Sequence, residues 1–357
     1  MIGIVFVGDL YVCPYLHRYV DACVESNTSY EVLFWNRCGE KLELPENYYY
    51  FNLLSKEDKS VFLKIFDFLN YRRWLIKRIK KQKYDRLIIL STLSGIFLAD
   101  VLHKYKGRYI FDIRDYSYEH IKLFYLIEKK IIKNSAYTAI SSPGFKNFLP
   151  EHDYYIIHNM QSSEAKYKGS FSKKQYGEKL NVVWNGTMRY FQHQRNVIMR
   201  LANDPRFMMY FHGSGPELEL YEKFAEENKV DNIVFTGRYN NAQKIALLAN
   251  ADLLNNSYWM DNKNEVLFAV SNRYYDGLIY RIPQLLEAGT YKAKVCEDNG
   301  IGVAIDARVE TFADRLYEWY FQIDVVRFDE KCQFLLDKAI EDDMKINDRL
   351  VEFLQGK

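Results

Sequence analysis

Short apolar runs alternate with amphipathic segments along the whole chain of 357 residues. Apolar runs bounded by turn residues are typical of buried strands, and the segments between them are typical of helices that cover a parallel sheet. The expected strands are residues 2–7, 30–35, 87–90, 109–113, 137–140 and 154–157, then 180–184, 207–212, 233–236, 251–255, 283–287 and 302–305. The expected helices of the second half are residues 194–202, 216–228, 241–249, 272–281, 309–322 and 330–354. The pattern predicts an α/β protein with a parallel sheet in each half.

One segment that is rich in Ser, Lys and Gly interrupts this pattern. Residues 161–179 lose the apolar periodicity, which is typical of a linker. A chain of this length also fits two domains better than one. We therefore expect one domain over 1–160, a second over 180–330, and a C-terminal helix over 331–357 that could pack back across a cleft between them.

Composition excludes several classes of protein. The net charge of +2 gives no general attraction to nucleic acid. Five scattered cysteines without a CxxC pair indicate reduced thiols rather than disulfides or a zinc site. The start of the chain lacks a basic leader, and no apolar run approaches the roughly 20 residues that span a bilayer. We expect a cytoplasmic protein.

One segment is strongly basic. Residues 61–83 carry eight Lys or Arg against the single acid Asp67, interleaved with aromatic and aliphatic residues. This segment is either a surface helix with a solvated basic face or a helix that docks peripherally on the anionic inner face of the plasma membrane. Nucleic acid is the weakest alternative, because no nucleic-acid-binding motif accompanies the segment. The residues expected on a membrane face are Arg72, Arg73, Trp74, Lys77 and Arg78.

Polar residues follow two predicted strands of the first half. Gly8 and Asp9 end the first strand, where a doubly wound fold places its ligand loops, although they form no GxGxxG motif. Asp115 and Glu119 are four residues apart and could share a helical face as a base and an orienting carboxylate. An ion-pair network around Arg114 that only holds the domain edge explains the same charges equally well.

Glycine follows three predicted strands of the second half, at Gly186, at Gly213 and Gly215, and at Gly237. Turns often need glycine for their backbone alone, but small residues at strand ends also let main-chain amides approach an anion. Four arginines accompany these loops, and guanidinium groups bind diphosphates through paired hydrogen bonds. They are Arg189, Arg195, Arg238 and Arg273.

Residues 271–290 combine a helical pattern with a buried strand. Tyr275, Leu278 and Ile279 have the spacing of a core-facing stripe, whereas Asn272 and Asp276 fall on a different stripe. The segment is either an ordinary αβ unit or a helix whose first half holds a phosphorylated, sugar-bearing ligand.

Four stretches of the second half resemble the donor domain of GT-B glycosyltransferases of the family-4 type. They are VVWNGTMRYFQHQRN, YFHGSGPELELYEKFA, NIVFTGRYNNAQKIALLANADLLNNS and SNRYYDGLIYRIPQLLEAGTYKAKVCEDNGIGVAI. In the first half, FDIRD and YTAISSPGFKNFLP resemble segments of the acceptor domain of that family. The resemblance implies two Rossmann-like domains facing a central cleft.

The resemblance also implies a function. It is the transfer of a sugar from a UDP- or GDP-type nucleotide sugar to a saccharide acceptor. The expected acceptor is lipid-linked, as in the synthesis of surface or capsular polysaccharides, and no tightly bound cofactor or metal is expected. The implied donor contacts are Gly186, Arg189, Arg195, Gly213, Gly215, Arg238, Asn272, Arg273, Tyr274 and Asp276. The implied acceptor-side residues are Gly8 and Asp9, and the candidate catalytic residues are Asp115, Glu119 and Glu265.

The chain departs from the family at one position. Asp276 stands where the family carries the second acid of a paired E-x7-E motif, which contacts the donor ribose. Eight residues earlier the chain has Phe268, and the nearest acid is Glu265. Retention of the anomeric configuration is favoured only by the resemblance. An epimerase or hydrolase of the same fold, and a catalytically silent sugar-nucleotide-binding protein, are the alternatives.

Overall fold

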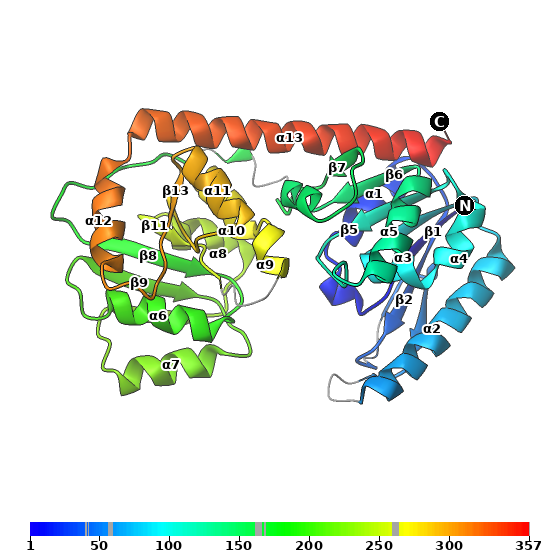
Figure 1. Ribbon diagram of the computed structural model, residues 1–357, viewed down its shortest axis with the longest axis horizontal. Coiled ribbons are helices and arrows are strands. Elements are labelled where there is room, and N and C mark those ends of the chain that lie inside the picture. The colour runs from blue at the N-terminus through cyan, green and yellow to red at the C-terminus, as the bar shows by residue number, and fades with distance from the viewer. Residues whose placement is uncertain are drawn as a thin grey trace. The chain divides into compact units, whose positions relative to one another are not determined.

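The computed structural model describes residues 1–39, 41, 43–55, 60–160, 166–167, 169–258 and 264–356. The chain divides into two compact units (Figure 1). The first unit comprises Met1–His158 and Asp342–Lys357, and the second comprises Asn159–Glu341. Much of the linker expected over 161–179 is described, but residues 161–165 and 168 lie outside the described part.

The first unit is built on a seven-stranded sheet in the order β3-β2-β1-β4-β5-β6-β7. Every pair of neighbouring strands in it is parallel, as the continuous apolar runs predicted. The strands are β1 Ile2–Phe6, β2 Tyr30–Asn36, β3 Tyr48–Asn52, β4 Arg86–Leu90, β5 Tyr109–Ile113, β6 Tyr137–Ile140 and β7 Tyr154–Ile156.

Helices lie on both faces of this sheet (Figure 1). They are η1 Leu10–Val12, α1 Leu16–Glu25, α2 Val61–Gln82, α3 Thr92–Phe97, α4 Ala99–Leu102, η2 His103–Tyr105, α5 Lys122–Asn134 and η3 Pro143–Asn147. The last helix, α13 (Val325–Gln355), contributes its final turns to this unit. There Ile346, Leu350 and Phe353 recur at helical spacing and are buried in the core of the first unit.

Two local features differ from the sequence prediction. Strand β3 was not expected; it lies at the edge of the sheet and its residues are half exposed. The expected helical face shared by Asp115 and Glu119 is wrong, since α5 begins only at Lys122. The Glu119 carboxylate accepts a hydrogen bond from the Ser117 amide at 2.6 Å, and such short-range bonds stabilise a turn instead of a helix.

The second unit is built on a six-stranded parallel sheet in the order β10-β9-β8-β11-β12-β13. Its strands are β8 Leu180–Asn185, β9 Phe207–His212, β10 Ile233–Gly237, β11 Leu253–Asn255, β12 Gln284–Leu286 and β13 Gly302–Ala304. Its helices are α6 Phe191–Leu201, α7 Leu218–Glu227, α8 Asn241–Leu248, α9 Asn264–Phe268, α10 Asn272–Tyr280, α11 Tyr291–Asp298, α12 Phe312–Gln322 and the start of α13. The predicted α/β class with two Rossmann-like sheets is confirmed.

No helix in the described part of the chain is both long enough and apolar enough to cross a membrane.

Candidate functional site

The strand order of the second unit reverses beside β8, which pairs with β9 on one side and with β11 on the other. In doubly wound sheets a ligand binds outside the carboxyl ends of the strands at such a point. The loops after β8, β9 and β10 begin at this edge. They contain five of the ten residues predicted to contact a donor, Gly186, Arg189, Gly213, Gly215 and Arg238.

Glycines allow these three loops to pack against one another. The Gly186 amide donates to the carbonyl oxygen of His212, and the Gly213 amide donates to that of Gly237, each at 2.9 Å. A Cβ atom on Gly213, whose φ is +143°, would lie 1.8 Å from the carbonyl oxygen of Gly186. A Cβ on Gly215 would lie 2.6 Å from the Met188 carbonyl oxygen. The close approach of the loops therefore requires glycine at these positions.

A buried carboxylate lies at the centre of the site. Asp276 on α10 accepts a hydrogen bond from the side-chain amide of Asn185 at 2.8 Å and pairs with the Lys244 ammonium group of α8 at 2.5 Å. Tyr239, in the loop before α8, belongs to the same cluster, because burial and the charge of Asp276 raise the pKa of its phenol. Three elements thus bring their polar groups together at the carboxyl end of β8.

Arg273 lies beside this carboxylate with its guanidinium group held in one orientation. The group stacks 3.3 Å from the centre of the Trp184 ring, and its Nε donates to the carbonyl oxygen of Asn185 at 2.5 Å. Its Nη1 is buried and has no hydrogen-bond partner in the described part of the chain. Burial lowers the pKa of Arg273, so an anion bound here would stabilise the charged form.

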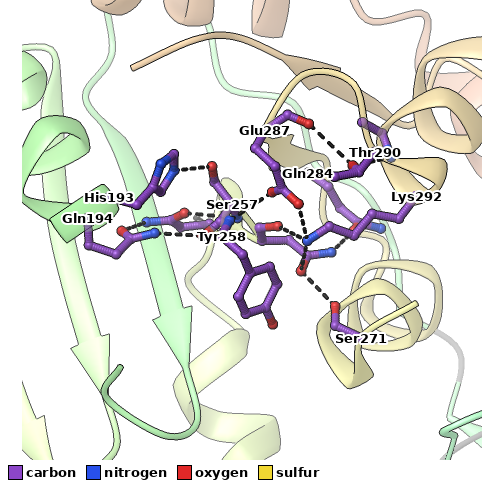
Figure 2. Close-up of polar contacts among 12 residues, drawn as sticks. His193, Gln194, Ser257, Tyr258, Ser271, Gln284, Glu287, Thr290 and Lys292 are labelled. Carbon is purple, nitrogen blue, oxygen red and sulfur yellow. Dashed lines mark hydrogen bonds and ion pairs between the residues drawn. The ribbon is translucent and has the colours of Figure 1, made fainter. Parts of the chain in front are cut away.

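A network of buried hydrogen bonds holds the loop after β11 (Figure 2). The Lys292 ammonium group donates to the Asn256 carbonyl oxygen at 2.6 Å and pairs with the Glu287 carboxylate at 3.0 Å. Glu287 also accepts a hydrogen bond from the Tyr258 amide at 2.8 Å, and the Ser271 hydroxyl donates to the Asn256 side chain at 2.7 Å. The network ties this loop to the beginnings of α10 and α11, which carry Arg273 and Lys292.

The structure separates the two arginines between which the sequence could not choose. Arg189 follows β8 and is exposed, and its charge lowers the pKa of neighbouring Arg273. Arg195 lies one turn into α6 and lines a cavity of about 450 Å³ that borders the Tyr258–Glu287 part of the network. That cavity is lined by Gln192, His193, Arg195, Asn196, Tyr258, Glu287, Ala288, Ile305, Asp306, Ala307 and Arg308. Burial and nearby Lys292 lower the pKa of His193 to about 4, which leaves its imidazole neutral at neutral pH.

The other predicted donor contacts differ in their exposure. Arg238 and Asn272 are exposed, at the end of β10 and the start of α10 respectively. Tyr274 is buried, and it packs edge-on against Tyr275 in the core. The side chain of Glu265 lies outside the described part of the chain.

In the first unit, the predicted acceptor-side residues bond to their own chain. The Asp9 carboxylate accepts hydrogen bonds from the amides of Arg37 and Cys38 at 2.7 and 3.2 Å. Asp115 is exposed, whereas Glu119 is buried and its pKa is raised by burial. Glu119 lines a cavity of about 320 Å³ together with Tyr116, His120, Lys122, Tyr125 and Phe148.

The residues predicted for a membrane face divide between two sides of α2. Arg72, Arg73 and Lys77 line one cavity. Trp74 instead packs on Phe51 and Tyr71, with ring centres about 6 Å apart. Arg78 pairs with Glu31 at 2.8 Å and stacks over Tyr49.

No cluster of three or more His, Cys, Asp or Glu side chains that could hold a metal ion occurs among the described residues.

Comparison with known proteins places this architecture. No family model matches the chain, and no curated protein matches it.

Solved structures do match over almost its whole length. Sucrose-phosphate synthase from Thermosynechococcus elongatus matches with a TM-score of 0.66 and 12% identity, covering 98% of each chain. Anabaena HepE in complex with UDP matches with a TM-score of 0.68 and 10% identity, covering 98% of this chain and 99% of that one. WaaG, a glycosyltransferase of lipopolysaccharide biosynthesis, matches with a TM-score of 0.61 and 12% identity over all of both chains. The chain has the GT-B fold.

The GT-B fold expected from the sequence resemblance is thus confirmed. Within this GT-B chain, sequence reasoning missed Asn185, Tyr239 and Lys244, which surround Asp276. It also missed Lys292 and Asn256 in the network behind Tyr258. Asn185 directly precedes Gly186 and could have been included with that loop, but no local signal pointed to Lys244.

Proposed function

We propose that the protein is a glycosyltransferase that transfers a sugar from a nucleotide-sugar donor to a saccharide acceptor. The observation that supports this most directly is the buried Arg273, whose Nη1 lacks a partner among the described residues, beside the Asp276–Lys244 pair at the carboxyl edge of the second sheet. The matching structures include HepE in complexes with UDP, with UDP and glucose, and with UDP-glucose. We therefore propose a UDP- or GDP-type donor in the second unit.

The proposed chemistry uses the charge at this edge. An acceptor hydroxyl forms a bond to the anomeric carbon, the bond from that carbon to the diphosphate breaks, and the hydroxyl proton passes to a general base, for which the Glu119 carboxylate is proposed. Negative charge then develops on the departing diphosphate, and preorganised cations stabilise it. We assign this role to Arg273 and Arg189 without a tightly bound metal, and we assign the donor ribose to Asp276. Retention of the anomeric configuration is proposed from the sequence resemblance.

The acceptor is proposed to bind the first unit, near the Glu119 cavity. Aromatic rings provide apolar faces beside which the C–H faces of a sugar ring can pack. Tyr116, His120 and Phe148 provide such rings around the buried Glu119. The Oε1 atom of Glu119 has no hydrogen-bond partner among the described residues, so it could accept a bond from an acceptor hydroxyl. Its raised pKa also brings this carboxyl closer to the range of a general base.

The acceptor is further proposed to be lipid-linked, as in surface polysaccharide synthesis on the cytoplasmic side of a membrane. The first half of α2 exposes a group of large apolar side chains, including Leu63 at 55% and Phe66 at 63%. Ile65 and Leu69 extend the group, and the second half of the helix is rich in Lys and Arg. This combination of exposed apolar and basic residues is typical of helices that lie in a membrane interface.

A catalytically silent nucleotide-sugar-binding protein is the second candidate. Both oxygens of Asp276 already have partners, in Asn185 and Lys244, and position 268 carries Phe instead of an acid. Such a protein would bind the donor without consuming it. A hydrolase of the same fold would release the sugar without any acceptor.

The experiment combines calorimetry with a turnover assay. Arg189→Ala should weaken UDP or GDP binding by about 1.5–3 kcal/mol, the contribution of a charge-assisted hydrogen bond. Arg195→Ala is the comparison variant, because this exposed arginine faces the cavity beside Tyr258 and Glu287 instead of the loop after β8, and under this assignment it should change affinity by less than about 0.5 kcal/mol. Equal affinities in wild type and both variants would overturn the phosphate assignment.

Turnover is then followed with a panel of radiolabelled nucleotide sugars, with and without a lipid extract. A labelled glycolipid formed only with the extract is the result expected for a lipid-linked acceptor. Free sugar in the absence of acceptor would indicate a hydrolase, and binding without turnover under every condition would indicate the silent protein.

A further inference from the structure

The first unit contains a large basic cavity that the proposed transfer reaction does not use. It has a volume of about 930 Å³ and lies between α2 and the segment 100–108. Asp85 and Arg108 stand directly before β4 and β5, so the cavity is at the amino edge of the sheet, opposite the edge of Asp9. Its lining residues are Arg72, Arg73, Ile76, Lys77, Ile79, Lys80, Lys83, Tyr84, Asp85, Asp100, Val101, Lys104, Tyr105 and Arg108.

The charge of this cavity is much more positive than the chain as a whole. Its lining includes seven Lys or Arg and only two acids, whereas the complete chain has a net charge of +2. Both acids already have a cationic partner. Asp100 pairs with Arg72 at 2.6 Å, and Asp85 pairs with the amino group of Met1. Neither acid is therefore available to neutralise the remaining cations.

Those remaining cations are close to one another. Arg73, Lys77 and Lys80 are separated by four and three residues, so they are neighbours on one face of α2. Together with Lys83 and Lys104, they form no ion pair with any residue in the described part of the chain. Like charges at these spacings destabilise a helix. A bound anion would remove this repulsion and supply the missing negative charge.

The cations share their face with the exposed apolar residues of α2. Phe66 precedes Arg73 by seven residues, which is two helical turns, and it lies on the same stripe. The 22 residues of the helix span about 33 Å, with the apolar part in the first half and the basic part in the second. A soluble phosphate compound would satisfy only the basic part. An anionic lipid offers phosphate and hydrocarbon together, so it matches both parts.

We propose that this cavity binds the phosphate-bearing head groups of anionic membrane lipids. The inference rests on the membrane-docking part of the proposed function, and it adds the cavity and the residues that contact the head groups. Arg73, Lys77 and Lys80 contact the head groups, while the apolar half of α2 enters the interface. The cavity thereby sets the orientation of the first unit on the membrane.

The test is co-sedimentation of the full chain with vesicles of phosphatidylcholine, with and without phosphatidylglycerol. The test variant is Lys77→Glu with Lys80→Glu. The matched control is Lys129→Glu with Lys133→Glu, which makes the same charge change at exposed positions of α5 in the same unit. Wild type and control should prefer the anionic vesicles. The test variant should bind them at least about tenfold more weakly, because each lysine near an anionic surface contributes strongly to binding.

Each outcome has one meaning. Equal losses in the test and control variants, or a full affinity in the test variant, would overturn the head-group cavity. The proposal would also be overturned if calorimetry showed that glycerol phosphate or inorganic pyrophosphate binds wild type but not the Lys77→Glu, Lys80→Glu variant, while anionic vesicles do not bind wild type. If wild type binds neither kind of vesicle, membrane docking as a whole is wrong. If it binds both kinds equally, only the proposal that the cavity binds anionic head groups is wrong. UDP affinity of the same variants reports separately on the transferase proposal.

Discussion

The two units have the same strand order around their first strands, but the loops that follow β1 and β8 make different contacts. In the first unit β1 lies between β2 and β4, and in the second β8 lies between β9 and β11. After β1, the Asp9 carboxylate occupies the amides of Arg37 and Cys38. After β8, Gly186 has no side chain that could accept a hydrogen bond. The loops after β8, β9 and β10 instead form main-chain hydrogen bonds with one another.

This difference lies in the loops and not in the topology, because β1 and β8 hold the same place in their sheets. A phosphate that approached the Arg37 and Cys38 amides would compete with the carboxylate that already fills the place of an anion. A phosphate at the corresponding edge of the second unit would instead meet Arg273, whose Nη1 lacks a partner among the described residues. If the proposed function holds, the same fold carries one edge that is filled by its own carboxylate, the self-filled site, and one edge that receives an anion, the receptive site.

The largest effect expected from this comparison concerns the Asp276–Lys244 pair of the receptive site. Their side chains are only 4% and 11% exposed, so Lys244→Met would remove the cation that is paired with a buried carboxylate. We expect a loss of about 3–5 kcal/mol in the free energy of unfolding, measured by urea denaturation. Lys223→Met, which breaks the exposed Lys223–Glu227 pair, is the control and should cost less than about 1 kcal/mol. A similar small cost for both variants would show that the buried pair is not a structural part of the site.

A second difference between the units is that the first contains a buried carboxylate with no ion-pair partner among the described residues, whereas Asp276 of the second is paired with Lys244. Glu128 on α5 of the first unit is fully buried, and neither of its oxygens has a hydrogen-bond partner in the described part of the chain. Burial, followed by the charge of Glu119, raises the pKa of Glu128 to about 8. The folded protein therefore keeps a proton on Glu128 that the unfolded chain loses above about pH 4.5. As a result, the free energy of unfolding decreases as the pH rises from about 4.5 toward 8.

Glu128→Gln should remove this dependence while keeping the shape of the side chain. Wild type should lose up to about 1.4 kcal/mol of unfolding free energy per pH unit within that window, and the variant should not. Denaturation at several pH values measures the difference. Glu151→Gln, at an exposed position of the same unit, is the control. If wild type and Glu128→Gln show the same slope, Glu128 is ionised in the folded protein at neutral pH.

The sequence predicted most of the fold because buried parallel strands are continuous apolar runs. Strands β5 and β9 have the bounds that were expected, Tyr109–Ile113 and Phe207–His212. Strand β3 was missed because it is an edge strand, with residues that are half exposed. The turn before α5 was missed because a single Glu119–Ser117 hydrogen bond replaces a helical turn there, and a helical spacing cannot reveal such a bond.

The candidate site was predictable only where its residues share one element. Helical spacing placed Asp276 on a separate stripe from the core residues, and both Asp276 and Arg273 meet Asn185 at the end of β8. Lys244 comes from another helix, and only the packing of α8 brings it to Asp276. The positions of Arg189 and Arg195 depend on where α6 begins, which is Phe191, three residues before the predicted start.

The smallest expected effect is also the most direct test of the self-filled site. Asp9→Ala would leave the amides of Arg37 and Cys38 without their carboxylate, which should cost about 1 kcal/mol in stability. Inorganic phosphate should then restore part of the loss, because an anion can replace the carboxylate at these amides. The melting temperature of the variant should rise with phosphate more than with chloride of equal ionic strength, whereas wild type should respond equally to both. A phosphate response of equal size in wild type and variant would mean that Asp9 does not exclude anions, and the contrast between the two units would then have to come from the cations of the second unit alone.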